Sequence, residues 1–129
     1  MEKDTIDELF SDGVPFDETA VVKTLKPYVN IQKSTNKIFL NNVDKLSAKN
    51  KILLYSLAKK LLKFSNHIDD ETISALEFFN KTKIKKGTID FAFKDLRDEG
   101  LLIGSGSSYE IPNLKISEIL TRFDKVKKS

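Results

Sequence analysis

The feature that most constrains the fold is a long stretch of helical periodicity after Ser47. Leucine and alanine recur there at intervals of three and four residues, which places them on one face of an α-helix. Ser47 is a suitable N-cap for such a helix. The apolar face is formed by Leu54, Leu57, Ala58 and Leu61, and the side expected to face water carries Lys49, Ser56, Lys59, Lys60 and Lys63. The pattern predicts a core built against the leucine face.

Composition limits what can surround this helix. A chain of 129 residues, 40% hydrophobic and 32% charged, is the size of one domain with a single core. With no cysteine and one histidine, it excludes disulfide scaffolds, thiolate nucleophiles, cysteine-ligated zinc and multi-histidine metal sites. The N-terminus does not resemble a signal peptide, and lysines interrupt the longest apolar stretch. We expect a soluble, cytoplasmic protein without membrane contact, metal or cofactor.

Charge is divided unevenly along the chain. Residues 1–18 hold seven acidic residues and one lysine, a net charge of −6, whereas the other 111 residues hold 21 basic and 12 acidic residues, a net charge of +9. A body with this excess attracts polyanions, although isolated lysines are also explained by solubility. Two clusters are less easily explained in that way: Lys45, Lys49, Lys51, Lys59, Lys60 and Lys63, and then Lys81, Lys83, Lys85 and Lys86.

Residues 1–46 are expected to precede the main domain. Residues 1–16 read as an acidic, flexible leader. Asp17 can cap a short helix that runs through Lys26 and is stopped by Pro27. The segments YVNIQ and KIFL, separated by the polar KSTN, then indicate a β-hairpin.

Two further helices are predicted after the long one. Asp69 or Asp70 can cap a helix that continues to about Asn80, with the core stripe Ile73, Leu76 and Phe79. The next helix begins near Lys86 and ends at Gly100, a residue suited to the left-handed conformation at helix C-termini. Its inward face is predicted to be Ile89, Ala92, Phe93 and Leu96.

The C-terminal part is expected to add a small sheet and a last helix. The segment LLIGSGSSYEIP predicts two short strands, 101–103 and 109–111, around a Gly-Ser turn. From Asn113 onward an amphipathic helix is predicted, with the stripe Leu114, Ile116, Ile119, Leu120 and Phe123. This stripe, together with the helix at 17–26, can form a homodimer interface or can pack within the same chain.

The order of these elements resembles the winged-helix variant of the helix-turn-helix fold. The segment ISALEFFNKTKIKKGTIDFAFKDLRDEGLLIGSG carries the likeness: Ile84 lies in the turn, Thr88 and Ile89 open the third helix, Leu96 anchors its end, and EGLL leads into the wing. The resemblance to winged-helix transcription regulators covers about half the chain. It implies a mainly α fold with a small β component, with the domain at 47–112, an N-terminal extension at 17–46 and a C-terminal helix at 113–129.

In such a fold the first turn of the third helix enters the DNA major groove. That turn would present Lys85, Lys86, Gly87 and Thr88. Further contacts are expected from Lys94 and Arg97 and from the wing hydroxyls of Ser105, Ser107 and Ser108. Gly87 can leave the backbone open to a phosphate, or it can be a residue merely tolerated near a helix start.

Some residues depart from the DNA-binding pattern. Asp90 and Asp95 put negative charge on or beside the same helix face, unless they pair with Lys86, Lys94 or Arg97. The wing segment GSGSS has no basic residue. Phe91 can contact a thymine methyl or a partner if it is exposed, but we favour packing against a terminal extension.

No catalytic constellation is present in the sequence. His67 is expected to cap or to be solvated, and the acidic run 69–71 is expected to complement a helix dipole. We therefore predict a non-catalytic protein that binds double-stranded DNA, a transcriptional regulator. The alternative is a protein-interaction module on the same scaffold, with the lysine-rich long helix or the acidic leader meeting a partner.

Overall fold

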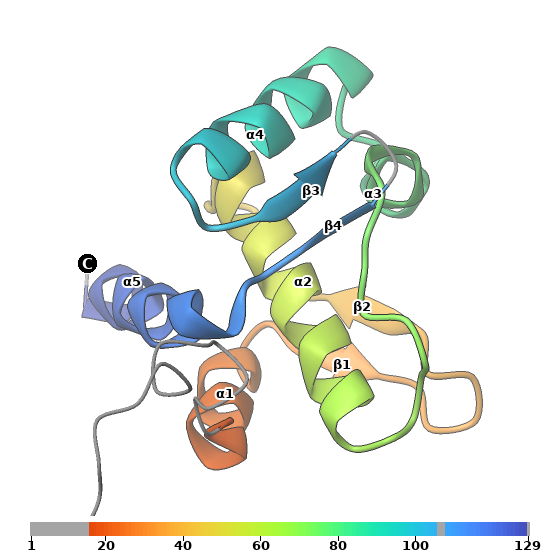
Figure 1. Ribbon diagram of the computed structural model, residues 1–129, viewed down its shortest axis with the longest axis vertical. Helices are drawn as coiled ribbons and strands as arrows, with labels where there is room; N and C mark the ends of the chain where they lie inside the picture. Colours follow the sequence, from red (N-terminus) through yellow and green to blue (C-terminus); the bar gives the residue numbers. More distant parts are fainter. Residues whose placement is uncertain (1–15, 106–107, 129) are drawn as a thin grey trace, which may run out of the picture.

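The computed structural model describes residues 16–105 and 108–128, which are mainly helical and include two small antiparallel sheets (Figure 1). In chain order the elements are α1 (Glu18–Leu25), β1 (Val29–Ile31), β2 (Ile38–Leu40), α2 (Ala48–Phe64), α3 (Ala75–Thr82), α4 (Lys86–Asp98), β3 (Ile103–Ser105), β4 (Ser108–Glu110), the 3₁₀ helix η3 (Asn113–Lys115) and α5 (Ile116–Lys128). The predicted leader falls outside the described residues except for Phe16. Within the described ranges, no helix has the length and apolarity needed to cross a membrane.

The long helix predicted after Ser47 is α2, and it occupies the centre of the fold. The Ser47 hydroxyl accepts a hydrogen bond from the Asn50 N–H at 3.1 Å, which confirms the predicted cap. The expectation that one side of α2 faces water is wrong, because Ser56 is 1% exposed and Lys60 is 6% exposed. The reason is that α1, α4 and the first sheet all pack on α2, so that no wide solvent-facing side remains.

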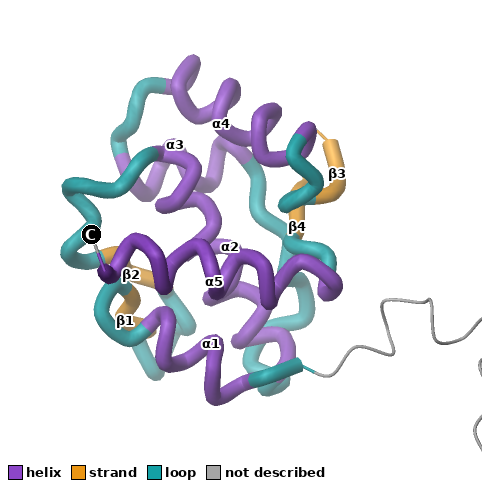
Figure 2. The backbone as a smooth tube through the Cα atoms, turned by 90° about the vertical axis from the view of Figure 1, so that its left-hand side faces the viewer, coloured by secondary structure: helices purple, strands orange, loops and turns teal. Residues whose placement is uncertain are grey.

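The N-terminal extension forms as predicted. The Asp17 carboxylate accepts a hydrogen bond from the Ala20 N–H at 3.0 Å, and α1 ends at Leu25, before Pro27. The hairpin β1–β2 follows, with Asn30 opposite Phe39. Figure 2 shows α1 and α5 beside each other and next to α2.

The predicted start and core face of α3 need correction. Ser74, rather than Asp69 or Asp70, caps this helix by accepting from the Glu77 N–H at 3.0 Å. Asp70 instead accepts from the backbone and hydroxyl of Thr72, in a local turn that competes with helix formation. Because the helix begins later than predicted, the residue that it buries in the core is Phe78. Leu76 is 61% exposed, and Ile73 lies before the helix, paired with Tyr109.

Helix α4 confirms its predicted bounds and inward face. Ile89, Ala92, Phe93 and Leu96 are all buried, and Gly100 has a φ of +82° just after the helix. The ring of Phe93 lies between Phe78 and Tyr109, with centroid distances of 6.2 and 4.8 Å. These aromatic contacts join α4 to α3 and to the second sheet.

The second sheet begins two residues later than predicted. Leu101 and Leu102 are buried, and both donate backbone N–H bonds to the Leu96 carbonyl. The core therefore holds these leucines, and β3 starts at Ile103. Strand β4 spans Ser108–Glu110, and Ile111 follows it into the core.

The C-terminal helix packs within the chain. Ile116, Ile119 and Phe123 are buried, and the Phe123 ring lies 6.3 Å from that of Tyr28. Leu114 belongs to η3 and is exposed, so it does not extend the predicted stripe. Of the two alternatives for this apolar face, the described residues show packing inside the chain.

The hairpin β3–β4 depends on a glycine in the middle of its first strand. Gly104 has a φ of +123°, and a Cβ there would lie 2.0 Å from the Ser108 carbonyl oxygen. We expect Gly104→Ala to lower the free energy of unfolding by about 2 kcal/mol or more, since backbone strain and a backbone clash add. Urea denaturation measures the loss. Gly100→Ala is the matched control: its φ of +82° is also unfavourable, but only the Lys115 side chain is near, at 3.7 Å, so a smaller loss is expected.

Candidate nucleic-acid interface

The first turn of α4 is open to solvent. Lys85, Lys86, Gly87 and Thr88 are all exposed. Lys85 is the N-cap residue, and no side chain caps the helix start. The backbone N–H groups of this turn are therefore available to solvent or to an anion, and they lie at the positive end of the helix dipole.

Nothing in the described structure requires glycine at position 87. A Cβ placed there meets no atom within 4 Å, and Gly87 does not have a positive φ. Packing and backbone conformation thus do not explain this residue. The open backbone at the second position of α4 is compatible with close approach of a phosphate.

The lysines that lead into α4 are also exposed. Lys83 adopts a left-handed conformation, with a φ of +61°, and ends α3, while Ile84 packs against the core as the anchor of the turn. Lys81, Lys83 and Lys85 form no ion pair with a described residue. Lys86 lies 3.5 Å from the Asp90 carboxylate, but both side chains are well exposed and such a pair is weak.

The outer face of α4 continues from this turn. Lys94 and Asp90 are exposed, as predicted. The favoured interpretation that Phe91 packs against a terminal extension is wrong, since Phe91 is 67% exposed and neither α1 nor α5 covers it. An aromatic ring therefore stands on the same face as the basic residues.

Three of the five lysines of α2, in contrast, are paired with carboxylates from other elements. Lys49 contacts Asp95, at 3.2 Å, and Glu99. The hydrogen bond to Glu99 raises the pKa of Lys49 above its ordinary value. Lys59 pairs with Glu77 at 2.9 Å and Lys60 with Glu71 at 2.8 Å. Half of the first lysine cluster is thus neutralised within the fold, whereas Lys45, Lys51 and Lys63 have no ion pair with a described residue. In the second cluster the one ion pair with a described residue is the weak one of Lys86.

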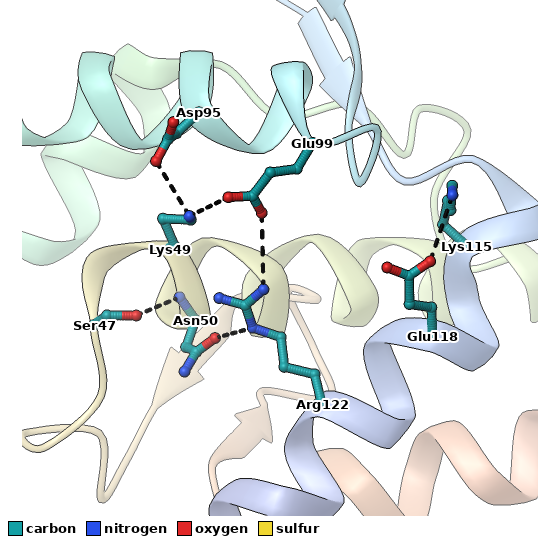
Figure 3. A network of polar contacts seen from close by, with 8 residues as sticks. All are labelled: Ser47, Lys49, Asn50, Asp95, Glu99, Lys115, Glu118 and Arg122. Atoms are coloured by element: carbon teal, nitrogen blue, oxygen red, sulfur yellow. Dashed lines mark hydrogen bonds and ion pairs between the residues drawn. The ribbon is translucent and has the colours of Figure 1, made fainter.

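A polar network holds the C-terminal half of α4 (Figure 3). Arg122 of α5 donates from Nε to the Asn50 side chain at 2.7 Å, and its Nη1 lies 3.9 Å from Glu99. Together with Lys49, these residues connect α2, α4 and α5. Asp95 belongs to this network, so the predicted pairing of Asp95 with Lys86, Lys94 or Arg97 is wrong. Arg97 is exposed and lies 3.8 Å from Asp98.

The sequence does not predict this network, because its partners are far apart along the chain. Lys49 is 46 residues from Asp95, and Asn50 is 72 residues from Arg122. Helical spacing relates only residues three or four positions apart, so it offers no signal for such pairs. For Asp95, helical spacing favours local partners, although the true partner, Lys49, lies on another helix.

The second sheet lies against α4 and is fixed at one point to the segment before α3. The Ile73 N–H donates to the Tyr109 carbonyl at 2.7 Å, and the Tyr109 N–H donates back at 2.8 Å. Of the predicted wing hydroxyls, Ser108 is exposed and Ser105 ends β3, whereas Ser107 lies outside the described residues. The wing therefore offers one described serine side chain to a ligand.

A second group of titratable side chains joins β4, the segment before α3 and α2. Glu71 does not complement the α3 dipole as expected; it binds Lys60 and shares a hydrogen bond with Glu110 of β4. That bond, with burial, raises the pKa of Glu110 to about 7. Burial opposes ionisation of Glu71, but its bonds to Glu110 and Lys60 prevail and hold its pKa below the ordinary value.

No metal-type cluster of three His, Asp or Glu side chains occurs in the described ranges. His67 is exposed, with Nδ1 3.0 Å from the Ser65 hydroxyl, in the connector where a solvated role was expected. A scan of protein-family models, a search of curated proteins and a search of solved structures find no match to this chain. Function is therefore inferred from geometry and charge.

The Glu71–Glu110 pair predicts a pH-dependent stability. Folded Glu110 keeps its proton up to about pH 7, whereas the unfolded side chain releases it near 4.5. Between these values the folded state binds more protons, so the free energy of unfolding should fall as the pH rises. Urea titrations at about pH 5 and about pH 7.5 should show this decline in the wild type and a smaller decline in Glu110→Gln. Glu118→Gln, an exposed carboxylate of α5, should keep the wild-type slope, and equal slopes in all three proteins would contradict the assignment.

Proposed function

We propose that this chain is a cytoplasmic, non-catalytic DNA-binding protein of winged-helix type that acts as a transcriptional regulator, with α4 as its recognition helix. The observation that carries the proposal is the contrast between the two lysine clusters. Lys49, Lys59 and Lys60 of α2 are paired inside the fold, whereas Lys81, Lys83, Lys85 and Lys86 stand exposed in the segment that leads into the uncapped start of α4. Exposed lysines at a helix N-terminus suit a phosphate backbone.

The arrangement around α4 supports a winged-helix assignment. The elements α2, α3, α4, β3 and β4 follow one another in the order of the resemblance, and the β3–β4 hairpin lies beside α4 (Figure 1). The Ile73–Tyr109 bridge and the Phe93–Tyr109 ring contact hold the hairpin there. A hairpin in this place can follow the DNA backbone next to the groove that receives α4.

The residues of α4 would have distinct roles in the complex. Lys85 and Lys86 would neutralise phosphates, and the backbone at Gly87 and Thr88 would donate to a phosphate oxygen. Phe91 and Lys94 would reach the major groove, where an apolar side chain can contact a thymine methyl group. Arg97 and Ser108 would reach the DNA backbone on either side of the groove. Asp90, which lies beside Lys86, can accept a hydrogen bond from a cytosine N4 amine.

The alternative is a protein-interaction module on the same scaffold. The exposure of Phe91 beside Asp90 favours it, because protein interfaces are enriched in aromatic residues. Its version based on α2 loses part of its support, since Lys49, Lys59 and Lys60 of that helix are occupied. A homodimer through α1 and α5 also loses its expected surface, because Val21, Leu25, Ile119 and Phe123 are buried in the chain's own core.

A salt titration tests the DNA-binding proposal. If about five or six phosphates are neutralised, binding to a mixed-sequence duplex should weaken with salt with a log–log slope of about −4 to −6. Lys85→Ala/Lys86→Ala should flatten the slope by about one to two units, as measured by fluorescence anisotropy. The control Lys23→Ala/Lys26→Ala removes the same charge from exposed positions at the C-terminal end of α1, where Lys26 is the C-cap, and should keep the wild-type slope. If both double variants behave as the wild type does, α4 is not the DNA-binding element.

Gly87→Ala distinguishes the two interpretations of this glycine. The new Cβ meets no atom of the described chain, so the free energy of unfolding should rise by about 0.5–1 kcal/mol because the unfolded backbone loses freedom. DNA affinity should fall nonetheless, since the methyl group obstructs a phosphate at the helix start. A stabilised variant with wild-type affinity would mean that Gly87 is only tolerated.

A further inference from the structure

The outer edge of strand β2 has no partner strand. In the β1–β2 hairpin the Asn41 N–H donates to Tyr28 and the Gln32 N–H donates to Lys37. Hydrogen-bonded pairs alternate along an antiparallel ladder, so the pair Asn30–Phe39 is also hydrogen-bonded, and the backbone groups of Ile38 and Leu40 point away from β1. Within the described ranges no hydrogen bond reaches these groups from that side.

A groove runs along this edge. It has a volume of about 430 Å³ and is lined on one side by residues 38–41. Lys51 and Tyr55 of α2 and residues 80–82 of α3 form the opposite wall. Figures 1 and 2 both show β2 on the side of its hairpin that faces α3. The open backbone edge and the groove are therefore parts of one surface.

This surface is positively charged. Lys51 and Lys81 line the groove together with a single carboxylate, Asp44. A smaller cavity of about 220 Å³ continues the groove and adds Lys37 and Lys59. Its carboxylate, Glu77, is held by Lys59 at 2.9 Å and by the Tyr55 hydroxyl at 2.7 Å. The charge that remains is that of Lys37, Lys51 and Lys81 against the single carboxylate of Asp44, a net positive charge.

Apart from its short length, the strand lacks the features that usually protect an edge. Natural edge strands carry charged residues, proline or bulges that prevent pairing with another chain. Strand β2 is Ile38–Phe39–Leu40, without any of these, and Phe39 is 47% exposed with the Lys81 ammonium 5.8 Å from its ring. An unprotected edge next to lysines is suited to a strand that carries acidic side chains.

We propose that this groove binds an extended acidic segment of a partner protein, which adds to β2 as a third strand. A peptide fits better than a nucleic acid, because the edge offers both N–H donors and carbonyl acceptors at Ile38 and Leu40, and phosphates accept but do not donate. Alternate side chains of the segment would contact the apolar wall at Leu40 and Val43. Its carboxylates would pair with Lys51 and Lys81.

The test uses the full chain and a synthetic peptide of about ten residues in which glutamate alternates with valine, with both ends blocked. NMR hydrogen exchange should show slower exchange of the Ile38 and Leu40 amides when the peptide is added. Methylating alternate backbone nitrogens of the peptide should abolish binding, because it removes the donors to β2. Lys51→Gln/Lys81→Gln should weaken binding about tenfold, and Lys23→Gln/Lys26→Gln on α1 should leave it unchanged.

Several results would overturn the proposal. An acidic third strand would be excluded if the peptide left the exchange of both amides unchanged. It would also be excluded if the N-methylated peptide, or a peptide in which lysine alternates with valine, bound as tightly as the glutamate–valine peptide. Protection of the amides by a DNA duplex would make the groove a nucleic-acid contact. Faster exchange after deletion of residues 1–15 would assign the edge to the chain's own N-terminus. Lys85→Ala/Lys86→Ala should not affect peptide binding, so the outcome is separate from that for DNA.

Discussion

Burial of α2 on nearly all sides is the constraint on which the rest of the structure depends. A helix that contacts α1, α4 and the first sheet leaves no wide face for water, so even Ser56 and Lys60 are buried. A buried ammonium is tolerated only with a charged or hydrogen-bonding partner, and Glu71 supplies it. The segment that carries Glu71 is thereby held against α2.

The same arrangement decides which positive charges remain available. Asp95, Glu99 and Glu77 are directed towards lysines of α2 and not towards the outer face of α4. The carboxylates that would repel a polyanion are thus largely withdrawn from that face, with Asp90 as the remaining one near its start. Net charge alone does not reveal this separation, because the fold assigns the partners.

Helix α4 is fixed at one end and open at the other. Lys49 and Arg122 bind its C-terminal end to α2 and α5 (Figure 3). Its N-terminal turn has no capping side chain and is exposed. A binding surface placed on a rigid helix needs little reordering when it meets a ligand. Anchoring of the C-terminal end of α4 therefore supports recognition of a ligand by its N-terminal turn.

By itself, the sequence determined the local elements: the caps at Asp17 and Ser47, the inward face of α4 and the hairpin β1–β2 all follow from residue type and spacing. It also located the exposed basic turn at Lys85. Only the tertiary structure decided that Lys60 is buried, that Phe91 is exposed, and that Lys49 meets Glu99. The physical reason is range, because caps and helix faces depend on neighbours within four residues. Burial and ion pairing, in contrast, depend on which elements the core brings together.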